Sequence, residues 1–322
     1  MVKKTKFGVY DQYIIENELM KVELLSYGAT IKKIVFDGKD VTLGYDSAEE
    51  YENGTFYIGG TIGRYGNRIQ NGTFTLNGKT YQVDKNENKI TCLHGGFTGF
   101  DKLIWDGEIL SENAVSFSVN SPDGQCGFPG NLDMKIVFTL EKSSLVLNYF
   151  AVCDTDTIFN PTNHVYFNLD GYDGAECRDM IVNLPAKYYL PVDEHLIPTG
   201  EIADVAGTKF DFTSPRTISE DFDHCFVYGL EKTFRQAGTL LSQNSKIQMD
   251  IHTDMPGIQM YTCSAFEAPN GKGGIPLHKH QGIALETQFF PDSPNHKNFP
   301  STVLKKGEPF ESKTIYSFSK IK

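Results

Sequence analysis

Alternation of apolar and polar residues recurs along the chain and constrains its fold most strongly. Segments 115–119, 134–140 and 145–151 each place apolar side chains at every second position. A period of two is typical of strands that bury one face. Amphipathic helical patterns are missing from the sequence, apart from single turns that we expect at 47–51 and 214–218. The sequence therefore predicts an all-β protein.

Hairpin turns are predicted between several of these strands. Asn77-Gly78 lies between two alternating segments, and Asn-Gly is a preferred pair for a two-residue type I′ turn. Such a loop would place Phe74 opposite Tyr81 on one side of the sheet. Asp37-Gly38 and the polar break at 142–144 are interpreted as further hairpin turns.

The organisation of the chain is expected to be simple. Its 322 residues contain no Pro/Ser-rich linker, no charge block and no repeat of solenoid or propeller period. We therefore expect a single domain over residues 1–322, built as a large antiparallel β-sandwich, because sandwiches often exceed about 200 residues. A closed barrel or a double jelly roll is the alternative arrangement.

Charge and hydropathy exclude several kinds of partner. Lys and Arg total 30 against 41 Asp and Glu, and the net charge of −11 disfavours binding to nucleic acid or to anionic membrane surfaces. No apolar segment is long enough to span a bilayer and no export signal is recognisable, so we expect a cytoplasmic protein. Monomer and homodimer both stay open.

Metal, thiol and serine chemistry are not indicated. Six cysteines are spread without a Cys-x-x-Cys pair, so we expect neither a zinc nor an iron–sulfur cofactor. Each cysteine is interpreted as a small buried hydrophobe, and Cys225, beside His224, is the one to check. His278 and His280 flank Lys279, which repels cations, and we interpret them as part of a solvated loop. A Gly-x-Ser-x-Gly elbow is missing from the sequence.

One acid, Glu286, interrupts a late apolar run that begins at Gly282 and precedes a turn-rich loop. If its side chain points inward, burial disfavours the charged carboxylate and raises its pKa toward the working range of a general base. If it points outward, Glu286 is an ordinary strand acid in contact with water. The segment alone supports both interpretations.

Arginine, amide and imidazole side chains occur next to glycines or amides. The loop before the Asn-Gly hairpin contains Arg64, Asn67 and Arg68, whose planar donors can hold hydroxyls or carboxylates. A loop stabilised by its own hydrogen bonds is the alternative. His94 precedes two glycines, which allow a ligand to approach closely, and His164 lies among side-chain amides that can fix its tautomer. For each histidine, a satisfied polar core residue is the alternative.

Two later segments complete the set of candidates. Asp223 and His224 lie between Phe222 and Phe226 in the sequence. Asp223 can bind sugar hydroxyls or shift the pKa of a histidine. Gln259 and Tyr261 are two positions apart and therefore share a strand face, where an amide suits hydroxyl recognition. The aromatic residues that can pack either against a pyranose ring or in the core are Phe100, Trp105 and Tyr166.

Together these motifs closely resemble those of the aldose 1-epimerases, also called galactose mutarotases. The resemblance covers almost the whole chain in the expected order. It is carried by Gly63-Arg-Tyr-Gly-Asn67-Arg68-Ile, Leu93-His94-Gly-Gly, Asn163-His164-Val-Tyr-Phe-Asn168, Asp223-His224, Pro256-Gly-Ile-Gln259-Met-Tyr and Leu285-Glu286-Thr-Gln. The family implies a single large β-sandwich and cofactor-free interconversion of α and β anomers of aldohexoses, chiefly galactose and glucose.

The resemblance also implies a role for each candidate. Glu286 would be the general base and His164 the general acid, with His94 beside the ring oxygen of the sugar. The residues implied to hold sugar hydroxyls are Asn67, Arg68, Asp223 and Gln259. One departure from the family pattern is Tyr65-Gly66, where many relatives carry small apolar residues, and it puts the width of the pocket in question.

The chemistry of mutarotation fits these residue types. One base at the C1 hydroxyl and one acid at the ring oxygen suffice, so neither metal nor nucleophile is required.

Three rival hypotheses are a glycoside hydrolase that pairs Asp223 with Glu286, an epimerase of hexose 6-phosphates, and a carbohydrate-binding or sensor protein without turnover. A hydrolase gives no task to His94 and His164. Apart from the arginine loop, no cluster of Lys or Arg suits a phosphate.

Overall fold

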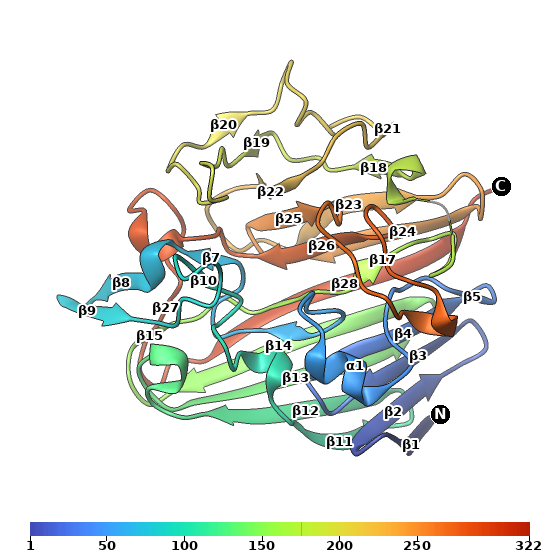
Figure 1. Cartoon of the computed structure of the whole chain (residues 1–322), viewed down its shortest axis with the longest axis horizontal. Coiled ribbons are helices and arrows are strands. Elements are labelled where there is room, and N and C mark those ends of the chain that lie inside the picture. The colour runs from blue at the N-terminus through green and yellow to red at the C-terminus, as the bar shows by residue number, and fades with distance from the viewer. Residues whose placement is uncertain (175) are drawn as a thin grey trace.

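Antiparallel sheets are the main regular elements of the computed structural model, which describes residues 1–174 and 176–322 (Figure 1). A five-stranded sheet contains, in order, β1 (Val2–Phe7), β2 (Tyr10–Glu16), β3 (Met20–Leu25), β4 (Thr30–Phe36) and β5 (Lys39–Asp40). A six-stranded sheet has the order β17 (Tyr166–Phe167), β26 (Ile283–Gln288), β25 (Gly257–Tyr261), β22 (Asp223–Val227), β19 (Tyr188–Tyr189) and β20 (Ala203–Asp204).

The largest sheet has nine strands and is open. Its order is β11 (Asp106–Ser111), β12 (Ala114–Ser121), β13 (Leu132–Glu141), β14 (Ser144–Cys153), β28 (Phe310–Lys320), β24 (Ile247–Thr253), β23 (Arg235–Leu241), β18 (Ile181–Asn183) and β21 (Arg216–Thr217). The strands β11 and β21 are its two edges. Among the described residues the sheet does not close on itself, so the alternative of a closed barrel is wrong.

Short elements connect these sheets. The two-stranded pairs are β6 (Thr61–Ile62) with β16 (Thr162–Asn163), β7 (Arg68–Ile69) with β10 (Cys92–Leu93), β8 (Thr73–Leu76) with β9 (Lys79–Gln82), and β15 (Thr157–Ile158) with β27 (Val303–Leu304). The helical elements are α1 (Ala48–Asn53) and the 3-10 turns η1 (Gln70–Gly72), η2 (Phe100–Lys102), η3 (Gln125–Gly127), η4 (Cys177–Asp179), η5 (Lys272–Gly274) and η6 (Ser293–Asn295).

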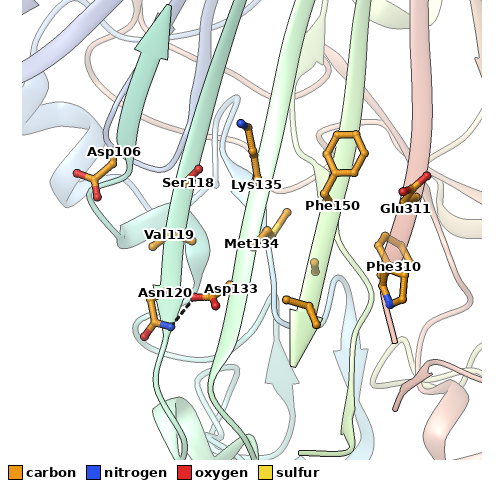
Figure 2. A pocket seen from close by; sticks show the side chains of 13 residues that line it. Asp106, Ser118, Val119, Asn120, Asp133, Met134, Lys135, Phe150, Phe310 and Glu311 are labelled. Carbon is orange, nitrogen blue, oxygen red and sulfur yellow. Dashed lines mark hydrogen bonds between the residues drawn. The ribbon is translucent and has the colours of Figure 1, made fainter. Parts of the chain in front are cut away.

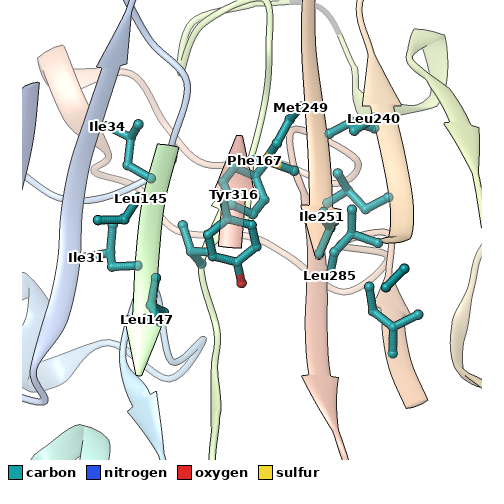
Figure 3. Packing of buried hydrophobic residues seen from close by; sticks show 14 of the residues in the cluster. Ile31, Ile34, Leu145, Leu147, Phe167, Leu240, Met249, Ile251, Leu285 and Tyr316 are labelled. Atoms are coloured by element: carbon teal, nitrogen blue, oxygen red, sulfur yellow. The ribbon is translucent and has the colours of Figure 1, made fainter. Parts of the chain in front are cut away.

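Alternation along the strands gives the nine-stranded sheet two different faces. The outer face carries polar side chains such as Ser118 and Lys135 beside the half-exposed Phe150 (Figure 2). The inner face packs against both other sheets, and Figure 3 shows Leu147 on β14 near Ile31 on β4, and side chains of β24 and β28 near those of β26. One apolar cluster therefore joins three sheets into a sandwich, which confirms the predicted fold class.

Most predicted turns are confirmed. Asn77-Gly78 connects β8 to β9, and the rings of Phe74 and Tyr81 stack with their centroids 5.3 Å apart. The side chain of Ser47 caps the first turn of α1 and forms a reciprocal capping box with Glu50, which confirms the turn at 47–51. The turn expected at 214–218 is wrong, because Arg216–Thr217 pairs with β18 as an edge strand.

The prediction of one domain over residues 1–322 stays a prediction. In the part of the chain that the structure describes, no helix has the length and apolar character that crossing a membrane requires.

The shared core predicts a large difference between the two faces of β14. Leu147→Ala removes a side chain that is 0% exposed and should lower the free energy of unfolding by about 2–5 kcal/mol, because a cavity remains between the sheets. Val152→Ala on the opposite face, where the side chain is 40% exposed, should cost under about 1 kcal/mol. Urea unfolding of both variants measures the difference, and equal costs would contradict this packing.

Candidate active site

Three adjacent strands of the six-stranded sheet bring the later candidates together. Gln259 on β25 and Glu286 on β26 are paired directly across the ladder, so their side chains lie on the same face of the sheet. Gln259 donates a hydrogen bond from Nε2 to Oδ1 of Asp223 on β22, at 2.6 Å. Neighbours such as Leu285 point to the opposite face and pack in the core. The strand period therefore separates polar site residues from core residues.

These residues line or adjoin a pocket of about 500 Å³. The predicted residues that line it directly are Asn67, Arg68, His94, His164, Asp223 and Glu286. Gln259 adjoins it through its hydrogen bond to Asp223. Of the three aromatic candidates, Tyr166 lines the pocket, whereas Phe100 and Trp105 are buried in the core. Segments far apart in the sequence thus meet at one place.

Glu286 and His164 form the buried centre of the site. Glu286 is 1% exposed, which confirms that its side chain points inward, and its Oε1 lies 3.5 Å from Nε2 of His164. Burial raises the pKa of Glu286 well above its usual value; the charge of Asp223 adds to the rise and Arg68 opposes it. Burial lowers the pKa of His164 to about 4. Both shifts favour the uncharged forms of the pair.

Two atoms of this pair have unused hydrogen-bonding capacity. Among the described residues, neither Oε2 of Glu286 nor Nδ1 of His164 has a hydrogen-bond partner, although both atoms are buried. Buried polar atoms without partners are costly in a folded protein. Their presence in a pocket indicates a site whose hydrogen bonds are completed by a ligand.

The tautomer of His94 is fixed by the backbone. The N–H of Asn67 donates to Nδ1 of His94 at 3.1 Å, so the proton of the neutral ring lies on Nε2. Burial lowers the pKa of His94 well below its usual value, and the nearby His164 and Arg68 add to this effect. His94 is therefore a neutral hydrogen-bond donor in the pocket.

The same tautomer bears on metal binding. His94, His164 and Glu286 each have a potential ligand atom, a ring nitrogen or a carboxylate oxygen, and these three atoms lie within 4.8 Å of one another. Many transition metals accept two histidines and a carboxylate as ligands. A metal needs an unprotonated ring nitrogen, whereas Nδ1 of His94 already accepts a hydrogen bond and Nε2 carries the proton. The arrangement fits proton transfer better than metal ligation, and the absence of a metal cofactor stays a prediction.

Arg68 is held between two carboxylates. Its guanidinium donates to Oε1 and Oε2 of Glu87 at 2.8 and 2.9 Å, and Nη1 donates to Oδ2 of Asp223 at 3.2 Å. Such bidentate pairs are among the stronger charge-assisted contacts. The positive charge of Arg68 is thereby compensated locally, and the orientation of its planar donors is fixed.

Comparison with known proteins identifies the family of this chain. The family model described as aldose 1-epimerase matches residues 11–317. Galactose mutarotase of Bos taurus is 39% identical over 97% of this chain and 95% of its own, and aldose 1-epimerase of Escherichia coli K12 is 35% identical over 94% and 93%. An aldose epimerase homologue from C. elegans matches with a TM-score of 0.92 and 30% identity, covering 98% of this chain and 100% of its own. The chain belongs to the aldose 1-epimerase family.

This aldose 1-epimerase family member contains site residues that the sequence motifs did not reveal. Glu87 lies in a polar stretch without any distinguishing pattern, and the pairing of β7 with β10 brings that stretch near Arg68. Tyr57 is equally unmarked, yet its ring centroid lies 4.6 Å from that of His94 and 5.9 Å from that of His164. Neither residue carries a local signal, because both act through tertiary contacts.

Several other candidates have structural contacts outside the pocket. Arg64 is buried and donates to Ser121 and to the carbonyl oxygen of Pro129. Tyr65 donates its hydroxyl proton to the carbonyl oxygen of Phe290 at 3.0 Å and does not line the pocket, so the departure from the family pattern does not narrow it. Cys225 is buried, and burial raises the pKa of its thiol, as expected for an inert residue.

One prediction for the loop after β25 is wrong. His280 is buried rather than solvated, and its Nε2 lies 2.6 Å from Oδ1 of Asp221. Asp221 lines the pocket, so this contact joins the loop to the edge of the site. The sequence pattern of two histidines around a lysine could not show a partner that is 59 residues away.

The raised pKa of Glu286 predicts a pH-dependent effect on stability. The folded state holds the Glu286 proton more tightly than the unfolded state, so ionisation destabilises the fold as pH rises above the unfolded pKa of about 4.3. Glutamine cannot ionise. The stability of Glu286→Gln relative to the wild type should therefore rise between about pH 4 and pH 8.

Thermal unfolding across this range measures the effect. Glu308→Gln, which removes a carboxylate whose side chain is 62% exposed, serves as the control and should differ from the wild type by the same amount at every pH. A pH-independent difference for Glu286→Gln would show that the pKa of this acid is not raised in the folded protein.

Proposed function

We propose that this protein interconverts the α and β anomers of aldohexoses such as galactose and glucose, as expected of an isomerase in this family. Its relatives are named galactose mutarotase and aldose 1-epimerase. The contact between Glu286 and His164, 3.5 Å long and buried in the pocket, carries the proposal because it supplies a base and an acid at one place. The implied partner is a small monosaccharide.

The reaction requires balanced proton transfer. Glu286 removes the proton of the C1 hydroxyl while His164 protonates the ring oxygen, and the ring opens to the free aldehyde. Rotation about the C1–C2 bond presents the other face of the aldehyde. Closure then returns both protons by the reverse steps. Neither a covalent intermediate nor a redox step is involved, so an acid–base pair completes the cycle.

The protonation of the pair suits this role. Glu286 and His164 titrate as a unit, and a form with one shared proton can be written either as two neutral groups or as carboxylate and imidazolium. Burial favours the neutral form in the free pocket. Sugar hydroxyls that hydrogen-bond to the carboxylate would favour the charged form. Binding of the substrate would thus generate the base and the acid together.

The remaining candidates are assigned to holding and orienting the sugar. Nε2–H of His94 would donate to the ring oxygen region, and the Asn67 amide, whose Oδ1 accepts from the backbone of Arg68, keeps its N–H donors for a hydroxyl. The Asp223 carboxylate and the Gln259 amide are hydrogen-bonded to each other, and we assign them to binding two neighbouring hydroxyls of the sugar. A cytoplasmic location stays a prediction, and the oligomeric state stays open.

The charges around the pocket favour an unphosphorylated sugar. Glu87, Asp221 and Asp223 line it together with Arg68, which is already paired with two of these acids. A sugar phosphate would meet repulsion rather than a free cation. For a hydrolase, Asp223 would have to act with Glu286, but it already accepts hydrogen bonds from Arg68 and Gln259. The pocket therefore fits the base and acid pair of an epimerase better than the two carboxylates of a glycoside hydrolase.

Optical rotation tests the proposed reaction directly. Fresh α-D-galactose, and separately α-D-glucose, should reach equilibrium faster with the wild-type protein than in weakly catalytic buffer. Glu286→Gln should lose about 10²–10⁴-fold in rate, because glutamine keeps the volume of the side chain but cannot accept the proton. Rates equal to buffer for the wild type, or cleavage of nitrophenyl galactoside, would contradict the proposal. Full activity of Glu286→Gln would contradict the assigned base.

A second variant tests the role of Glu87. Glu87→Gln should raise the KM for galactose about tenfold with a smaller change in kcat, because Arg68 loses a charge-assisted partner and its orientation. Glu176→Gln, which breaks the more exposed pair with Arg178, is the matched control and should leave both constants unchanged. A loss confined to kcat would place Glu87 in the chemical step and contradict a positioning role.

A further inference from the structure

A second hollow of about 490 Å³ lies on the outer face of the nine-stranded sheet. It is formed by β11–β14 and β28, whereas the candidate active site is formed by the six-stranded sheet and its loops. The two hollows have no lining residue in common and nearly the same volume. The proton chemistry described above leaves this outer hollow without a role.

Strand register places one row of side chains across the hollow. Asp106 pairs with Ser118, Ser118 with Lys135, Lys135 with Phe150, and Phe150 with Glu311. Adjacent strands lie about 4.8 Å apart, so the row spans about 19 Å over four steps and exceeds a single hexose ring in length. The row crosses the strands rather than following them.

The centre of the row is an aromatic surface with polar groups on both sides. Phe150 is 36% exposed, and Figure 2 shows its ring face-on, between Lys135 on one neighbouring strand and Glu311 on the other. An aromatic face packs well against the apolar C–H face of a pyranose ring. The flanking strands place an ammonium donor and a carboxylate acceptor where the hydroxyls at the rim of such a ring would lie.

The polar groups of the hollow are available to a ligand. Within the part of the chain that the structure describes, the side chains of Lys135 and Glu311 take part in no ion pair or side-chain hydrogen bond. Asn120 donates to Oδ1 of Asp133 at 2.8 Å, which orients this second acceptor at the edge of the hollow. Donors and acceptors are thus both present around an apolar centre.

The balance of charge narrows the class of ligand. Asp106, Asp133 and Glu311 outnumber Lys135 in the lining, so anions such as sugar phosphates are repelled. A second copy of this chain, with its net charge of −11, is disfavoured for the same reason. We propose that the outer face of the sheet binds a short, uncharged hexose oligosaccharide, with one ring stacked on Phe150. This site does not depend on the reaction proposed for the other pocket.

Met134 offers a local reporter for the test, because it precedes Lys135 on β13 and its buried side chain packs in the core directly beneath the outer face. Protein labelled with ¹³C at the methionine methyl groups is titrated with lactose, maltotriose and galactose 1-phosphate in the millimolar range. The Met134 signal, assigned with a Met134→Leu variant, should shift and saturate with the two neutral oligosaccharides but not with the phosphate. A saturating shift caused by trilysine and not by the oligosaccharides would overturn the proposal in favour of a cationic peptide.

Variants at Phe150 separate stacking from general surface effects. Phe150→Ala should weaken oligosaccharide binding about tenfold, whereas Phe150→Tyr should keep it, because tyrosine preserves the ring face. The rate of mutarotation, measured in parallel, should stay at the wild-type level in both variants. Equal titrations for wild type and Phe150→Ala, or no saturating Met134 shift, would overturn the proposal whatever the catalytic assay shows.

Discussion

The burial of one carboxylate on a strand with two covered faces is the constraint on which the site depends. All six residues of β26 are buried, because Leu285 faces the core shared by the sheets while Glu286 faces the pocket. A strand acid with one solvated face would stay ionised at neutral pH and act as a weak base. The layered sandwich thus prepares the proton affinity of Glu286 before any substrate binds.

Compensation of the Arg68 charge by two acids helps to keep the pKa of Glu286 high. An unpaired arginine beside Glu286 would favour the carboxylate and lower its proton affinity. The two acids that hold Arg68 reduce that influence, while the guanidinium still offers donors in a fixed orientation. Burial then outweighs Arg68 in setting the pKa of Glu286. In the proposed function, recognition of hydroxyls by Arg68 and the proton affinity of Glu286 are therefore coupled through one ion-pair network.

Sequence patterns predict this protein well where the signal is local. Alternation gives the all-β class and Asn77-Gly78 gives its hairpin. The apolar run around Glu286 marks this acid as a candidate, but only the structure decides that its side chain points inward. Contacts across the fold are different. The partner of His280 lies on a distant segment, and Arg216–Thr217 becomes a strand because β18 offers a ladder. The roles of the site residues came from the resemblance, since no spacing rule brings them together.

The loops that complete the site are fixed by mutual hydrogen bonds. Asn67 and His94 both have positive φ angles, 64° and 53°, a conformation that costs side-chain-bearing residues about 1 kcal/mol or more. Each stabilises the other: the N–H of His94 donates to the carbonyl oxygen of Asn67, and the N–H of Asn67 donates to Nδ1 of His94. The same bond that holds the loops sets the tautomer of His94. The strained loop conformation therefore fixes the direction of the Nε2–H donor of His94 in the pocket.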